Sequence, residues 1–264
     1  MTLQKSRSMR IALAVLRLFI PTRFRPSTSI TRLTMSQTKS RVQAGPFCGM
    51  QYVDQSYWSA YIPKLLGIYE RELSQYIEEA ALLPFETVVD IGAAEGYYAI
   101  GMAMRLPASR VIAFEMEPMA RELLGRLAAL NQVSCRVTIE GECTRRTLAA
   151  TLSESGRTLV ICDAEGGEAF LLDPIRIPKL AACHILVELH DNVLSGMSHE
   201  IRDRFSQTHD ITHVPETTRS RNDFPYNNVY TRLFPIYVDW AVSEIRRSKI
   251  SWYWMRPQLN SEAN

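Results

Sequence analysis

The stretch VVDIGAAEGYYAIGMAMRLPASRVIAFE, residues 88–115, decides the fold of this chain. Two short apolar runs, Thr87–Ile91 and Val111–Phe114, enclose a turn of small residues and a helical pattern that ends before Pro107. Runs that are apolar throughout are typical of buried parallel strands. A strand, a glycine turn and a helix N-terminus in succession let the backbone approach a ligand closely. The stretch therefore predicts a nucleotide-type cofactor site.

The alternation of strand and helix continues along the rest of the chain. Further strands are predicted at Arg110–Glu115, Arg136–Glu140, Thr158–Asp163, His184–Leu189, Asp210–Pro215 and Ser251–Met255. Helices are predicted at Pro63–Leu83, Tyr97–Arg105, Pro118–Leu130, Thr144–Leu152, His199–Phe205 and Trp240–Arg246. Such alternation favours an α/β fold, with a doubly wound, mostly parallel seven-stranded sheet covered by helices on both faces. The first helix is expected to be an N-terminal extension that packs on the sheet.

Charge is unevenly distributed along the 264 residues. Nine Lys/Arg and no acid precede Asp54, whereas 21 Lys/Arg face 28 Asp/Glu from there on, so that the whole chain is +2. Residues 1–45 are expected to be a flexible basic leader, with an interfacial helix, an organelle presequence or a start at Met35 as alternatives. Residues 46–83 are expected to be a loop and helix on the core, and residues 84–264 the catalytic domain. The excess of acidic residues from Asp54 onward disfavours nucleic acid as a partner.

The cysteines and the apolar segments indicate the cellular compartment of the protein. The five cysteines are odd in number and show no Cys-x-x-Cys spacing, which favours free thiols in a reducing compartment. The most apolar segment, residues 11–20, is too short to span a membrane and is interrupted by Arg17. The sequence thus predicts a cytoplasmic protein, with peripheral membrane contact through residues 1–41 as an alternative. It makes no prediction about oligomeric state.

Acidic residues follow every one of the first five predicted strands. Ligands of doubly wound sheets gather at the carboxyl ends of the strands, so these acids are expected to share one cleft. The glycine turn, Asp90-x-Gly92-x-x-x-Gly96, lacks the Gly-x-Gly-x-x-Gly triplet of nicotinamide cofactors. Fewer glycines favour an uncharged sugar-thioether ligand over a pyrophosphate. Glu115, at the end of the next strand, is placed to hold a ribose.

With these residues in view, the chain resembles a known enzyme family. The segment VVDIGAAEGYYAIG…VIAFEMEP resembles motif I and the following acidic strand end of class I S-adenosylmethionine-dependent methyltransferases. The later segments LVICDAEGGEAFLLD and ILVELHD resemble the FkbM-like branch of that class. The resemblance covers about Pro84 to Asp191 in ordered pieces. It implies S-adenosylmethionine as cofactor and methyl transfer to an oxygen of a small molecule or glycan.

The resemblance also assigns cofactor contacts. It places Asp90, Gly92, Ala93, Gly96, Glu115, Met116, Glu142 and Asp163 around S-adenosylmethionine. Within this set, Glu115 would hold the ribose hydroxyls, Glu142 would lie near the adenine amino edge and Asp163 would lie below the sulfonium.

Catalysis is expected at the ends of the fourth and fifth strands. Methyl transfer to a hydroxyl benefits from a base, and His190 has a suitable intrinsic pKa, with Asp163 and Glu165 as the other candidates. A purely structural His190 remains an alternative. By ligand type the three side chains could also hold a divalent cation, but their spacing establishes none, so no metal site is predicted. Two other functions stay open: a nicotinamide-dependent dehydrogenase on a similar sheet, and a non-catalytic cofactor-binding adaptor.

Overall fold

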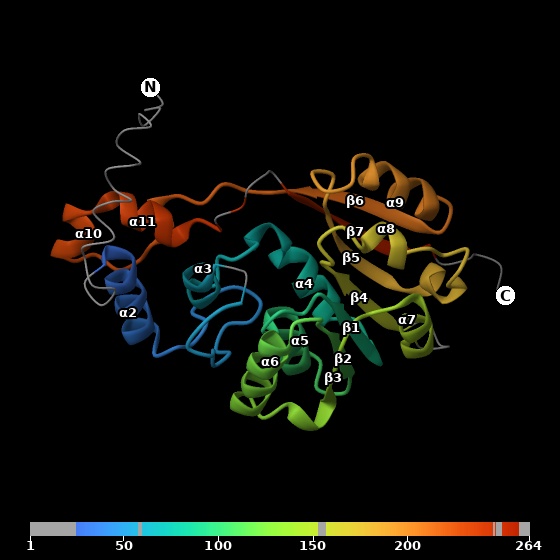
Figure 1. The fold of residues 1–264 in the computed structure, drawn as a ribbon, viewed down its shortest axis with the longest axis horizontal. Coiled ribbons are helices and arrows are strands. Elements are labelled where there is room, and N and C mark those ends of the chain that lie inside the picture. The colour runs from blue at the N-terminus through green and yellow to red at the C-terminus, as the bar shows by residue number, and fades with distance from the viewer. Residues whose placement is uncertain (1–24, 58–59, 153–156, 245, 247–249, 259–264) are drawn as a thin grey trace.

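A single seven-stranded sheet organises the molecule (Figure 1). The computed structural model describes residues 25–57, 60–152, 157–244, 246 and 250–258. The strands are β1 Thr87–Ile91, β2 Arg110–Phe114, β3 Val137–Glu140, β4 Thr158–Cys162, β5 His184–Leu189, β6 His209–Pro215 and β7 Ser251–Pro257. Their order is β3-β2-β1-β4-β5-β7-β6, with β1 to β5 parallel and β7 antiparallel to both neighbours. The predicted fold class is confirmed.

Helices cover both faces of the sheet. The helices of the described residues are α2 Pro26–Thr38, α3 Tyr61–Leu66, α4 Ser74–Ala81, α5 Tyr97–Arg105, α6 Pro118–Leu130, α7 Arg145–Thr151, α8 Glu168–Leu171, α9 Met197–Phe205, α10 Val229–Leu233 and α11 Pro235–Val242. Short 3-10 turns lie at Arg71–Leu73, Ser134–Arg136, Pro178–Ala182 and Arg221–Asp223. Neighbouring residues of β1 point to opposite faces: Val88 joins the core under α4, α5 and α6, whereas Val89 joins the core under α7, α8 and α9. This is why the strand is apolar throughout.

The predicted helix over Pro63–Leu83 is wrong, because Gly67 breaks it. Gly67 has a φ of +73° and ends α3 in the left-handed region. A Cβ at Gly67 would lie 2.0 Å from the carbonyl oxygen of Ala44. The chain must therefore turn here, and it resumes as α4 at Ser74.

Two other segments differ from the sequence-based expectation. Within the expected flexible leader, α2 buries Ile30 against α11 and α3 in a small separate core. Residues 1–24, the rest of that leader, lie outside the described residues. Near the C-terminus the expected helix over Trp240–Arg246 ends at Val242, and Arg246 lies in the connection to β7. Together α2, α10 and α11 form a lobe at one end of the molecule (Figure 1).

Two further observations concern the environment of the chain. Within the described residues, no helix is both long and apolar enough to cross a membrane. All five cysteines are free; Cys162 and Cys183 are buried in the core, whereas Cys48 and Cys135 are exposed.

The order of the strands locates the ligand crevice. The chain runs outward from β1 to β3 on one side and from β4 to β5 on the other, so the order reverses between β1 and β4. The loops at the carboxyl ends of these two strands diverge to opposite faces and leave a crevice between them. The fold therefore brings the glycine turn after β1 beside the acidic loop after β4.

Candidate functional site

The glycine turn is held tightly against the end of β4. Gly92 has a φ of +78°, and a Cβ on it would lie 1.7 Å from the carbonyl oxygen of Asp163. Asp163 N in turn donates to Ile91 O at 2.9 Å. Gly96, with a φ of +97°, begins α5 from the left-handed region. Both glycines are therefore required by backbone geometry.

Glu115 fixes the turn from the end of β2. Its Oε2 accepts a hydrogen bond from Ala94 N at 2.7 Å, and its Oε1 accepts one from Glu117 N at 2.8 Å. Ala94 itself has a φ of +47°, so this bond holds a left-handed non-glycine residue in place. Glu115 is part-buried beside the turn, at the position where the sequence predicts a ribose contact.

Asp90 lies buried under the turn. Its Oδ2 has no hydrogen-bond partner among the described residues. Burial raises the pKa of Asp90 to about 7, against the opposing effect of a hydrogen bond from the Ala99 backbone. A buried, half-satisfied carboxyl beneath the glycine turn agrees with the sequence prediction that Asp90 supports the turn or the ligand.

A closed ionic group fixes the start of α5. Glu95, fully buried, pairs with Lys64 through Oε1 and Nζ at 2.6 Å. Tyr52 donates to the same oxygen at 2.7 Å, as does Ser56, and Tyr57 N donates to Oε2 at 3.1 Å. Burial alone would raise the pKa of Glu95, but Lys64 and these hydrogen bonds lower it overall. This pair joins α3 to the glycine turn, and it was not predicted from the sequence.

The loop after β4 is organised by Glu168, the first residue of α8. Glu168 is fully buried. Its Oε1 accepts from Ala164 N at 2.8 Å and its Oε2 accepts from Gly166 N at 2.9 Å. These bonds hold Glu165 at a φ of +48° and Gly166 at +107°. The same carboxylate reaches His190, because Oε1 lies 2.8 Å from His190 Nδ1.

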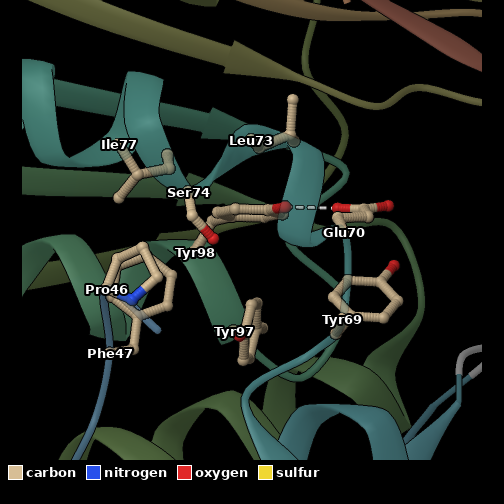
Figure 2. Close-up of a pocket in the computed structure, with 9 residues that line it drawn as sticks. All are labelled: Pro46, Phe47, Tyr69, Glu70, Leu73, Ser74, Ile77, Tyr97 and Tyr98. Carbon is tan, nitrogen blue, oxygen red and sulfur yellow. Dashed lines mark hydrogen bonds between the residues drawn. The ribbon is translucent and has the colours of Figure 1, made fainter. Parts of the chain in front are cut away.

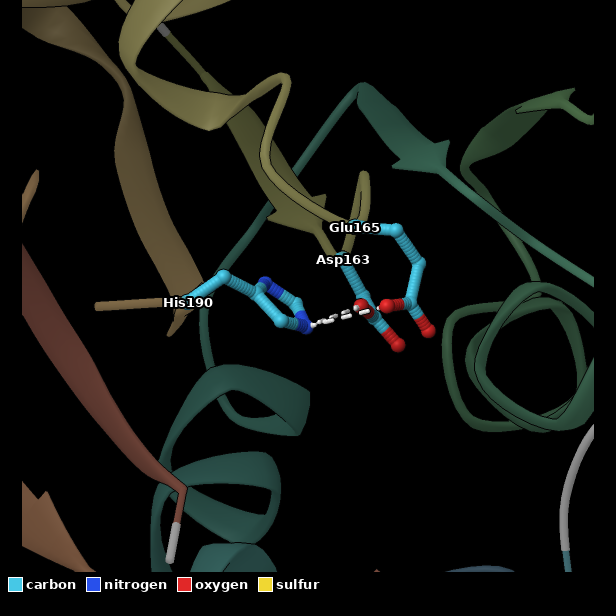
Figure 3. A group of neighbouring side chains, drawn as sticks. All are labelled: Asp163, Glu165 and His190. Carbon is cyan, nitrogen blue, oxygen red and sulfur yellow. Dashed lines mark ion pairs between the residues drawn. The ribbon is translucent and has the colours of Figure 1, made fainter. Parts of the chain in front are cut away.

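Nε2 of His190 faces three carboxylates at the ends of β4 and β5, of which Figure 3 shows Asp163 and Glu165. Since the Glu168 carboxylate accepts, Nδ1 of His190 carries the proton. The other ring nitrogen, Nε2, lies 3.7 Å from Asp163 Oδ1, 3.6 Å from Glu165 Oε2 and 3.7 Å from Glu188 Oε2. The fold thus brings together the three predicted catalytic residues, Asp163, Glu165 and His190.

Charge shifts the pKa values in this cluster. Burial lowers the pKa of His190, but Glu168 and the other carboxylates outweigh it and the net shift is upward. Burial also raises the pKa of Asp163 to about 6. The pKa of Glu188 is raised well above its usual value by burial and by Asp163, although Arg246 is paired with Glu188 and opposes the shift. By ligand type, Asp163, Glu165 and His190 are a set that could hold a metal ion, and their ligand atoms lie within 4.8 Å of one another.

The remaining predicted residues lie around the glycine turn or in the loops. Ala93 is buried in the turn, next to Gly92, and Ala93 N donates to Phe114 O at 3.0 Å. Met116 and Glu142 are exposed in the loops after β2 and β3. No role was predicted for Glu168 from the sequence. The third acid of Asp163-x-Glu165-x-x-Glu168 was the available signal, since the opening turn of a helix brings its first residue back towards the preceding loop.

A small aromatic pocket on the α4–α5 side is unsuited to a cofactor (Figure 2). Its residues are Pro46, Phe47, Tyr69, Glu70, Leu73, Ser74, Ile77, Tyr97 and Tyr98. Its volume of about 10 Å³ is room for about one water molecule. Tyr98 donates to Glu70 across it, as Figure 2 shows. We interpret it as a packing defect between tyrosines.

Comparisons with known proteins agree with the sheet and the turn. The model of the TRM5/TYW2 methyltransferase domain matches residues 70–179, which run from the 3-10 turn before α4 to the 3-10 turn before β5. A search of curated proteins found no match.

Several solved structures match the chain at low identity. A putative O-methyltransferase from Klebsiella pneumoniae is 11% identical, covering 94% of this chain and 96% of that one, with a TM-score of 0.45. Cofactor-bound Rv0187 from MTB is 12% identical, covering 94% and 97%, with a TM-score of 0.47. TYW2 of P. horikoshii, in complex with MeSAdo, is 13% identical, covering 72% of this chain and 62% of that one, with a TM-score of 0.42. At these scores the likeness carries no argument about function.

The decisive features are the matched domain model, the doubly wound sheet order and the glycine turn set against the end of β4. They agree with the class and the cofactor that the sequence predicts. Residues 70–179 match the model of a methyltransferase domain, and the sheet order and the glycine turn agree with the S-adenosylmethionine cofactor that the sequence predicts.

Proposed function

We propose that this domain is FkbM-like and transfers the methyl group to a hydroxyl oxygen of a small molecule or glycan. The observation that carries the proposal is the cluster of Asp163, Glu165 and His190 beside the glycine turn. A single orienting contact, from Glu168 to His190 Nδ1, leaves Nε2 directed at Asp163 and Glu165. This arrangement is suited to a hydroxyl, which must be oriented and must lose a proton.

The chemistry requires a donor and an acceptor in line. The acceptor oxygen attacks the methyl carbon as the carbon–sulfur bond breaks, and S-adenosylhomocysteine leaves. In the proposed complex the donor lies along the glycine turn, and the acceptor oxygen lies between the methyl group and the three side chains. Asp163, at the switch point between β1 and β4, then faces both ligands. The three catalytic residues activate the hydroxyl.

The cofactor contacts follow from the same placement. Gly92, Ala93 and Gly96 provide the close backbone surface, and Glu115 takes the ribose. Asp90 supports the turn from below. Met116 and Glu142, exposed in the neighbouring loops, take the adenine.

The charge of the chain bears on the class of acceptor. From Asp54 onward acids outnumber basic residues by 28 to 21. A phosphate backbone requires basic residues along its path, so a neutral hydroxylated acceptor is favoured over a nucleic acid.

Two measurements test the proposal. Calorimetry with S-adenosylhomocysteine should show one site per chain, and a tritiated-methyl screen of glycans and hydroxylated metabolites should label a hydroxyl. Substitution His190→Ala should lower turnover by about a hundredfold or more and change cofactor affinity little. The exposed Asp203→Asn on α9 is the control and should leave both unchanged.

Each part of the proposal has its own contrary result. Retained cofactor binding with no methyl transfer to any hydroxylated acceptor would favour a non-catalytic protein. Labelling of RNA in the same screen would replace the acceptor class, and equal turnover of the His190 variant would remove that residue from catalysis.

A further inference from the structure

The ends of β4 and β5 present an imidazole and two carboxylates to one point. The ligand atoms of Asp163, Glu165 and His190 lie within 4.8 Å of one another. We propose that these three side chains bind one divalent transition-metal cation, such as Mn²⁺, and that this cation receives the acceptor oxygen. The role of the cation rests on the proposed methyl transfer, whereas its binding does not.

His190 is presented as a metal ligand. Its side chain is only 3% exposed. Glu168 holds Nδ1 at 2.8 Å, and Nε2 points at Asp163 and Glu165 (Figure 3) with no hydrogen bond to a described residue. Histidines that bind metal usually donate their other ring N–H to a carboxylate, which fixes the tautomer and directs the free nitrogen at the ion. The buried Glu168 carboxylate is such a partner, and its own oxygens are satisfied by two backbone amides.

The charge around Nε2 is not balanced by neighbouring groups. Glu188 has a cation of its own in Arg246, which also pairs with Glu70 and Glu244. Asp163 and Glu165 form ion pairs only with His190 in the part of the chain that the structure describes. In addition, Asp163 Oδ1 is buried and lacks a hydrogen-bond partner there. The two carboxylates share one imidazole, and a further cation would satisfy Asp163 Oδ1, because a buried polar atom without a partner is costly.

The separations fit a cation after small side-chain shifts. Bonds of about 2.0–2.2 Å to a central ion place neighbouring ligand atoms about 3.0–3.4 Å apart. The observed 3.7 Å from Nε2 to Asp163 Oδ1 and 3.6 Å from Nε2 to Glu165 Oε2 are slightly longer. Glu165 is 82% exposed and free to move inward. Three protein ligands leave coordination positions open, as in catalytic rather than structural sites.

An open position next to the methyl donor explains what the ion does. A hydroxyl bound to a divalent cation loses its proton more readily, as a metal-bound water does. The proton passes to solvent, the oxygen attacks the methyl carbon, and the carbon–sulfur bond breaks to release S-adenosylhomocysteine. Glu168 is then a positioning residue that acts through His190.

Binding of Mn²⁺ to the full chain tests the site directly. After removal of bound metal with EDTA, titration followed by calorimetry and electron paramagnetic resonance should show one Mn²⁺ per chain. The substitutions Glu165→Gln and His190→Ala should each weaken binding at least tenfold. Glu165→Gln keeps the fold intact because the side chain is exposed. The exposed Asp203→Asn is the matched acidic control and should bind as the wild type does.

The outcomes separate this inference from the proposed function. Binding of S-adenosylhomocysteine should survive EDTA, whereas methyl transfer should stop and return with Mn²⁺. Absence of Mn²⁺ binding, or equal binding by the Glu165 and His190 variants, overturns the metal site while leaving the methyltransferase proposal standing. Mn²⁺ binding without any methyl transfer supports the site and overturns the proposed function.

Discussion

Two ionic groups flank the glycine turn, and they differ in how far their polar atoms are satisfied. Glu95, within the turn, is closed off by Lys64, Tyr52, Ser56 and the backbone of Tyr57. The group at the ends of β4 and β5 leaves Asp163 Oδ1 unpartnered among the described residues, and His190 Nε2 lies 3.6–3.7 Å from the carboxylates of Asp163 and Glu165. A saturated group can contribute only stability, whereas an unsaturated one retains the capacity to bind.

Gly92 lies in the same turn as Glu95 and against the backbone of Asp163, and its substitution should have the largest effect. In Gly92→Ala the new Cβ would overlap the carbonyl oxygen of Asp163, and the left-handed backbone would be strained as well. We expect a loss of at least about 4 kcal/mol in the free energy of unfolding, measured by urea denaturation, together with loss of cofactor binding. Gly141→Ala is the control, because its Cβ meets nothing within 4 Å. A stable, cofactor-binding Gly92→Ala protein would show that the close approach of β1 and β4 is not needed.

Lys64→Met opens the saturated group. It leaves the fully buried Glu95 carboxylate without its cation, which should cost about 3–5 kcal/mol of unfolding free energy. Arg126→Met removes an exposed pair with Asp54 and should cost less than about 1 kcal/mol. A similar loss of unfolding free energy in the two variants would contradict a stabilising role for the pair of Glu95 and Lys64.

Asp90 belongs to neither group. The pH dependence of the free energy of unfolding tests whether its buried carboxylate destabilises the fold. With a folded-state pKa of about 7, well above the usual range, the protonated form stabilises the fold at low pH. That stability is fully present below the unfolded pKa of about 3.9 and is lost as pH rises through about 7. Asp90→Asn should remove this loss, so its stability relative to the wild type should improve by on the order of 3 kcal/mol between pH 4 and pH 8. Thermal unfolding of both proteins across this range measures the difference, and parallel curves would rule out the shift.

Glu115→Gln should have the smallest effect. The amide keeps an acceptor for Ala94 N but loses the negative charge of that bond. We expect about tenfold weaker binding of S-adenosylhomocysteine, or about 1.4 kcal/mol, by calorimetry. The neighbouring Glu117→Gln keeps the backbone N–H that Glu115 accepts and should bind normally. Unchanged affinity in Glu115→Gln would place the ribose elsewhere.

Local pattern was sufficient for the regular core. The strands β1 and β5 and the helices α5 and α6 have the predicted bounds, because the strands are mostly apolar runs and each helix has a proline at one boundary, Pro107 after α5 and Pro118 at the start of α6. The break at Gly67 was not predictable in the same way. Its turn depends on the close approach of Ala44, a contact that no local pattern encodes.

The sequence by itself determined the fold class and the glycine turn, and it made Asp163, Glu165 and His190 candidates, since strand ends can be located from apolar runs and polar residues follow them. Tertiary structure decided which polar residues are satisfied. Glu95 and Lys64 are 31 residues apart, as Glu168 and His190 are 22 apart. Burial and the packing of separate elements decide whether a charged side chain forms a complete ion pair or keeps an atom available for a ligand. The glycine turn could therefore be recognised from the sequence, whereas the two ionic groups beside it could be distinguished only in the tertiary structure.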